Sequence, residues 1–76
     1  MIEAYLLITT PAGTSRAVVE QLRDLDAVQR ANVIAGEFDI ATIVMADSAQ
    51  ELLAFVTDEI QGIENVSRTR TCVVVE

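Results

Sequence analysis

Hydrophobic and polar positions alternate along this chain in a way that separates strand-like from helix-like segments. Residues 2–10 are apolar on both alternating sets, which is typical of a central strand buried on both faces of a sheet. Residues 28–35, 40–46 and 66–75 have the composition and length of three further strands. The segments between them follow a helical period, so the pattern predicts four strands and two helices.

The first helix is predicted after a break at Pro11-Ala12-Gly13, where Thr14 or Ser15 can cap its first turn. The second is predicted after Asp47, because Ser48 and Glu51 have the spacing of a capping box, and Gly62 ends it. Each helix has one apolar side. The first uses Val18, Leu22 and Leu25, and the second uses Leu52, Val56 and Ile60 with Leu53 and Ile63 beside them.

Two stretches, residues 25–30 and 63–68, have nearly the same sequence, Leu-Asp-Ala-Val-Gln-Arg and Ile-Glu-Asn-Val-Ser-Arg. Each follows a helical pattern and opens a strand, so the chain divides into two βαβ halves near residues 1–38 and 39–76. This order predicts an α+β fold: a ferredoxin-like βαββαβ sandwich of the dimeric α+β barrel type. Its four-stranded antiparallel sheet carries two helices on one face, and the other face needs a cover.

Length and charge narrow the classes of function. A chain of 76 residues forms a single domain, residues 1–76, whose small core makes self-association an expectation. The net charge of -7 would repel phosphate backbones and anionic lipid surfaces, so we expect no direct nucleic-acid binding and no membrane contact. The N-terminus shows no secretion signal and no apolar run long enough to span a bilayer, so we expect a cytoplasmic protein.

Few residues are suited to catalysis or metal binding. The chain has no histidine and no lysine, which removes the usual general base and the residue that forms Schiff bases. Cys72 is the only cysteine, so no internal disulfide forms, and we expect its thiol to be a small buried core residue. We therefore predict no catalytic residues, no metal site and no cofactor.

Three pairs of polar residues remain as candidates, each with two interpretations. Glu37 and Asp39 could form an acid/base pair, or they could bind backbone amides of a turn. Arg68 and Arg70 share one face of the last strand and could grip a carboxylate, or they could pair with acids of a neighbouring strand or subunit. Thr69 and Thr71 share the opposite face, where they could meet a ligand or serve as strand formers.

The opening strand, the Pro11-Ala12-Gly13 turn, the hairpin at residues 35–40 and the closing run at residues 68–74 together resemble an AsnC-type ligand-binding domain. This is the regulation-of-amino-acid-metabolism (RAM) module of the Lrp/AsnC transcription-factor family. The resemblance covers essentially the whole chain. Its most specific parts are the Gly-x-aromatic-Asp hairpin and the threonine-rich last strand. The family also carries an N-terminal helix-turn-helix, which we expect to be absent from this chain.

The resemblance implies dimers that pack sheet on sheet and assemble into octamers or decamers, with a free amino acid bound between dimers. We expect the ligand at Gly36, Glu37, Phe38, Asp39, Thr69 and Thr71. A zwitterion needs an acceptor such as Asp39, donors such as the amides around Gly36, and hydroxyl groups. Phe38 stands where tyrosine is frequent in the family, so a hydroxyl contact there is missing.

These features predict an amino-acid-binding, oligomerising regulatory module without its own DNA-binding domain, which could also join related Lrp/AsnC proteins. Two alternatives belong to other classes. One is a small dimeric α+β barrel enzyme with oxygenase-like or isomerase-like chemistry, which needs a roomy enclosed pocket with a polar group inside. The other is an oligomerisation unit that binds no ligand. The expectation that the protein is not an enzyme follows from its missing acid/base groups.

Overall fold

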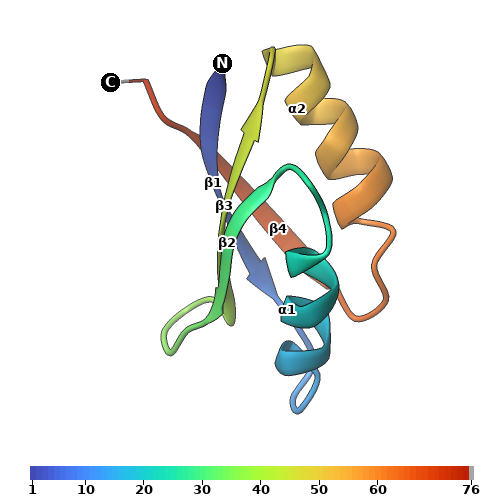
Figure 1. Cartoon of the computed structure of the whole chain (residues 1–76). Coiled ribbons are helices and arrows are strands. Elements are labelled where there is room, and N and C mark those ends of the chain that lie inside the picture. The colour runs from blue at the N-terminus through green and yellow to red at the C-terminus, as the bar shows by residue number, and fades with distance from the viewer. Residues whose placement is uncertain (76) are drawn as a thin grey trace.

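The computed structural model describes residues 1–75, which form four strands and two helical segments (Figure 1). The elements follow the order β1, α1, β2, β3, α2, η1, β4, in which η1 continues α2 as a turn of π-helix. Their bounds are β1 Ile2–Thr9, α1 Ser15–Arg23, β2 Val28–Val33, β3 Ile40–Ala46, α2 Ala49–Phe55, η1 Val56–Ile60 and β4 Arg68–Val73. This is the βαββαβ order that the sequence predicts.

The four strands form one antiparallel sheet in the order β2-β3-β1-β4. The first strand of each half, β1 or β3, lies in the centre, and the second strand lies at an edge. In the register, Leu6 of β1 pairs with Thr42 of β3 on one side and with Thr71 of β4 on the other. The fold is therefore the ferredoxin-like sandwich that the pattern predicts.

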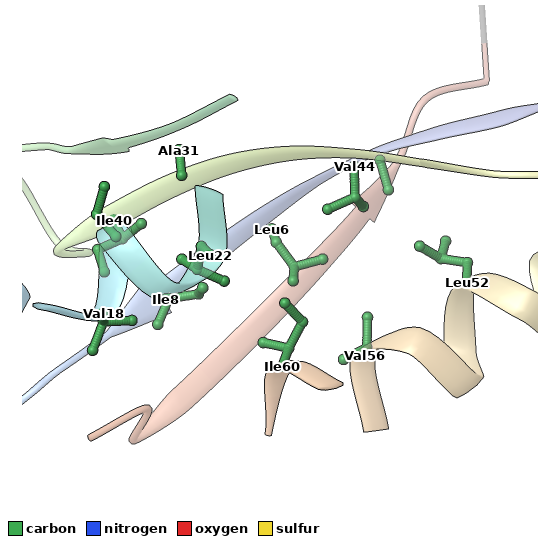
Figure 2. Packing of buried hydrophobic residues seen from close by; sticks show 12 residues of the cluster. Leu6, Ile8, Val18, Leu22, Ala31, Ile40, Val44, Leu52, Val56 and Ile60 are labelled. Atoms are coloured by element: carbon green, nitrogen blue, oxygen red, sulfur yellow. The ribbon is translucent and has the colours of Figure 1, made fainter. Parts of the chain in front are cut away.

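Both helices lie on the same face of the sheet, which we call the covered face (Figure 1). Buried apolar side chains fill the space between the two layers (Figure 2). The strands contribute alternate residues, as the period of two requires. The core consists of Ala4, Leu6, Ile8, Ala31, Ile40 and Val44 from the sheet and Val18, Val19, Leu22, Leu52, Val56 and Ile60 from the helices.

The helix ends match most of the predicted signals. The Ser48 hydroxyl accepts a hydrogen bond of 3.2 Å from the Glu51 amide, which is one half of the predicted capping box. Thr14 caps α1 by position, but its hydroxyl donates back to the Pro11 carbonyl at 2.7 Å. The prediction for Leu53 is wrong. Its side chain is 66% exposed because it points away from the sheet, whereas Leu52 is buried.

The repeated stretches adopt equivalent turns in the two halves. In the first, the Val28 amide donates to the Leu25 carbonyl at 3.1 Å, and in the second the Val66 amide donates to the Ile63 carbonyl at 3.3 Å. Each turn leads from the end of a helical segment into an edge strand. The repeated sequence therefore forms the same type of helix-to-strand turn in each half of the chain.

The other face of the sheet, which we call the open face, has no helix over it within residues 1–75 (Figure 1). Cross-strand partners point to the same side, so Tyr5 shares this face with its partners Ile43 and Cys72. Tyr5 is 47% exposed, so the predicted burial of the first strand on both faces does not occur within one protomer. The prediction that Cys72 is a core residue is also wrong, because it lies exposed on this uncovered side of an edge strand.

Candidate functional site

The loop between β2 and β3 folds against the end of β1 through a set of short hydrogen bonds. The Asp39 amide donates to the Ile8 carbonyl at 2.9 Å, and the Ile34 amide donates to the Asp39 carbonyl at 2.8 Å. These backbone bonds close residues 34–39 into a hairpin connection. Its tip therefore has a defined position relative to the end of the central strand.

The Asp39 carboxylate has a structural role in this hairpin. Its Oδ2 atom accepts a hydrogen bond of 2.8 Å from the Thr10 amide, and the residue is half-buried. The Thr10 hydroxyl is 2.7 Å from the Ser15 hydroxyl at the start of α1. This arrangement matches the interpretation in which an acid beside a turn glycine binds backbone amides. The carboxylate thus ties the hairpin to the turn before α1.

Beside the hairpin is a hollow of about 510 Å³ that is open at the surface. The β2–β3 loop contributes Glu37 and Phe38, and the neighbouring ends of β1 and β4 contribute the rest. The register brings these ends together, because Thr9 of β1 pairs with Arg68 of β4. The lining consists of Thr9, Glu37, Phe38, Arg68, Thr69 and Arg70.

The side chains around the hollow offer both charges, an aromatic ring and hydroxyl groups. The Arg70 guanidinium carbon lies 6.0 Å from the centre of the Phe38 ring, at the outer range of a cation–π contact. The Thr69 hydroxyl accepts a hydrogen bond of 3.3 Å from the Gln61 side chain and can still donate one of its own. Glu37 is exposed and adds a carboxylate to the rim.

The structure brings three of the six predicted site residues to this hollow, namely Glu37, Phe38 and Thr69. Gly36 lies next to them in the exposed loop, where an added Cβ would meet nothing within 4 Å. Asp39 belongs to the hairpin hydrogen bonds instead. Thr71 is not part of the lining; it pairs with Leu6, further along the edge strand.

Sequence reasoning left Thr9, Arg68 and Arg70 out of the site. The spacing of the two arginines did indicate a possible site, because residues two apart on a strand share a face and could bind a carboxylate together. No sequence pattern marked Thr9, since a threonine near the end of an apolar strand commonly has only a structural role. Only the antiparallel pairing of β1 with β4 places it opposite Arg68.

The hollow offers charged and hydroxyl groups that can bind a small polar ligand. The lining contains no histidine, lysine or cysteine, and Glu37 supplies its one carboxylate. Among residues 1–75, no three His, Cys, Asp or Glu side chains are grouped so that they could hold a metal ion. Within the same part of the chain, neither helical segment has the length and apolar character needed to cross a bilayer.

The similarity to known proteins extends over nearly the full length of this chain. A family model described as the Lrp/AsnC ligand binding domain matches residues 3–76. A protein of Pyrococcus abyssi named as an HTH-type transcriptional regulator is 37% identical over 60 residues, covering 79% of this chain and 40% of that protein. The chain thus spans about two fifths of the length of the curated relatives it matches.

Solved structures agree with the fold. FFRP-DM1 superposes with a TM-score of 0.94 at 32% identity, covering 99% of this chain and 100% of that one. The transcriptional regulator NMB0573 of Neisseria meningitidis, solved as a complex with L-Met, superposes with a TM-score of 0.88 over 99% of this chain and 50% of that one. At 17% identity, the second likeness concerns the fold alone.

Proposed function

Because the chain belongs to the Lrp/AsnC ligand-binding domain family, we propose that it is an amino-acid-sensing regulatory module that acts through self-assembly. The observation that carries the proposal is the hollow beside the β2–β3 hairpin. It combines a carboxylate, two guanidinium groups and hydroxyl groups within a domain of this family. These are the groups that complement an ammonium and a carboxylate.

In the proposed complex, the exposed Glu37 carboxylate accepts hydrogen bonds from the ligand ammonium. Glu37 takes this part and not Asp39, because Asp39 does not line the hollow and one of its carboxylate oxygens accepts from the Thr10 amide. Arg68 and Arg70, which share one face of β4, donate to the carboxylate end. The L-Met complex of the Neisseria meningitidis regulator supports the proposal to the extent that a protein of this fold can hold an amino acid.

We further propose that a second copy of the chain covers the open face. The face presents Tyr5 at 47% exposure in the middle of the sheet, beside its exposed cross-strand partner Cys72. A single domain of 76 residues also buries little surface by itself, which favours association. Dimers would then assemble into rings of eight or ten copies, and a ligand bound between subunits would favour the assembled form by mass action.

The module is proposed to work in the cytoplasm. It would act on transcription by joining related Lrp/AsnC proteins that carry a helix-turn-helix. The curated relatives support this connection, because they are named HTH-type transcriptional regulators. The alternative of a small enzyme gains no support from the hollow, which is open at the surface, whereas such an enzyme needs an enclosed pocket.

Titration calorimetry and thermal melting of the full chain with each of the twenty amino acids test the proposal. We expect heat of binding and a raised melting temperature with at least one of them at millimolar concentration, since a ligand stabilises the state that binds it. Light scattering with and without that ligand then tests the link to assembly. If none of the twenty produces heat or a thermal shift, the sensor proposal is wrong and a ligand-free oligomerisation unit takes its place.

A further inference from the structure

The hollow beside the hairpin is richer in positive than in negative charge, although the chain as a whole has a net charge of -7. Two of its lining residues are arginines, Arg68 and Arg70, and Glu37 is the acidic one. The lining therefore has one cation in excess. An amino acid with a neutral side chain has no net charge and would leave this excess uncompensated, whereas one with a second carboxylate would balance it.

The two arginines are placed to act together. They are two residues apart on β4 and so leave the strand on the same face, opposite Thr9 and Leu7 of β1. Arg70 has the Phe38 ring beside its guanidinium group, at 6.0 Å to the ring centre. An arginine offers a planar fork of donors that fits one carboxylate with two parallel hydrogen bonds. Two such forks on one face can hold two carboxylates.

We infer that the ligand of this site is an acidic amino acid, with Arg68 and Arg70 each binding one of its two carboxylates. Glu37 accepts hydrogen bonds from the ligand ammonium, as in the proposed function on which this inference rests. The arrangement gives every charge in the hollow a partner of opposite sign. A dicarboxylate without an ammonium, such as succinate, would leave Glu37 facing added negative charge and would bind more weakly.

Calorimetry on the full chain can test this selectivity with pairs of ligands that differ by one charge. L-Aspartate is compared with L-asparagine, and L-glutamate with L-glutamine. We expect the acid of at least one pair to bind about fivefold to tenfold more tightly than its amide, the range that one partly exposed, charge-assisted contact supplies. Added salt should reduce the ratio, because it screens exposed charges.

Two substitutions connect the preference to the arginines. One of the two variants, Arg68→Gln or Arg70→Gln, should bring the acid-to-amide affinity ratio close to one and leave the affinity for the amide within about twofold. The other should weaken acid and amide alike, because it removes the partner of the carboxylate that both ligands carry. The matched control is Arg30→Gln, which removes an arginine from β2, outside the hollow's lining, and should leave the ratio unchanged. Arg68→Lys and Arg70→Lys keep the charge but lose the planar fork of donors. They replace a glutamine variant that does not give a cooperative thermal melt.

The possible failures point to different conclusions. If the amides bind as tightly as the acids, the inference is wrong while the sensor proposal stands. If no amino acid binds, the sensor proposal itself is wrong. If the preference survives both glutamine substitutions, these arginines do not provide it. If the substitutions change the oligomeric mass and leave the affinity ratio intact, the arginines belong to a contact between subunits, which also overturns the inference.

Discussion

The two faces of the sheet are built from neighbouring residues of the same strands, yet they have different surroundings. On β1, Leu6 points to the covered face and is fully buried, whereas Tyr5 points to the open face and is 47% exposed. On β3, Val44 is buried and Ile43 is half-buried. The comparison shows that apolar character alone does not set burial in this protomer; the layer of helices does.

The covered face is packed so closely that it buries a polar side chain as well as apolar ones. Its one buried polar side chain among residues 1–75, Thr42, is fully buried, and its hydroxyl oxygen has no hydrogen-bond partner. Such a group lowers stability because it gives up its bonds to water without replacing them. The open face has no such constraint within a protomer, so substitutions on the two faces should affect different measurements.

The largest effect is expected from Leu6→Ala on the covered face. It leaves a cavity under both helices and should lower the free energy of unfolding by about 2–5 kcal/mol, a large part of the stability of a small domain. Urea unfolding measures it. The matched control is Leu7→Ala on the adjacent, half-buried position. Equal losses for the two variants at a concentration where the protein is monomeric would contradict the distinction between the faces.

The next effect concerns the cover over the open face. Tyr5→Asp places a charge in the middle of this face and should weaken self-association by at least about 2 kcal/mol, as expected at the centre of an interface. Light scattering should therefore report a lower mass at the same concentration. Leu53→Asp is the control, since it adds the same charge at a side chain that is 66% exposed on α2. An unchanged mass for Tyr5→Asp would show that nothing covers this face.

The reactivity of Cys72 can sharpen the comparison without any substitution. The thiol is exposed in the protomer and pairs across the sheet with Tyr5, so a second copy on the open face would cover it. We expect a thiol reagent to label it about tenfold more slowly at a concentration that favours assembly, which corresponds to roughly 1.4 kcal/mol of protection. A labelling rate that is independent of protein concentration would contradict coverage of this strand.

The smallest effect is expected from Thr42→Val. The two side chains have nearly the same shape, and valine removes the hydroxyl that has no partner. We expect the free energy of unfolding to rise by roughly 1 kcal/mol. Chemical denaturation measures the change, with Thr71→Val at an exposed position of β4 as the control. A loss of stability for Thr42→Val would mean that the hydroxyl has a partner in solution, such as a bound water.

The elements of the fold follow from local patterns. The β3 strand has the predicted bounds, 40–46, because a continuous apolar run lies between a glycine turn and a serine cap. The helical stripe of Leu52, Val56 and Ile60 is buried as predicted. This helix ends in a π-helical turn, in which the Gln61 amide donates to the Val56 carbonyl at 3.0 Å. The local sequence pattern did not predict this turn.

The candidate site was harder to predict because its lining comes from three segments. Glu37 and Phe38 could be singled out from the hairpin sequence, but their neighbours could not. Thr9 and Arg68 meet through the pairing of the first and last strands, which are far apart in the chain. Asp39 has the residue type of an ammonium acceptor, and only the tertiary structure shows that one of its carboxylate oxygens binds the Thr10 amide.

The sequence by itself determined the number, type and order of the elements, the two equivalent halves and the apolar side of each helix, since these depend on periodicity and on capping or turn residues close in the chain. Only the tertiary structure decided which face of the sheet the helices cover, why Cys72 is exposed, and which polar side chains share a hollow. The reason is that strand pairing and layer packing join residues that are distant in sequence, and no local pattern records those contacts.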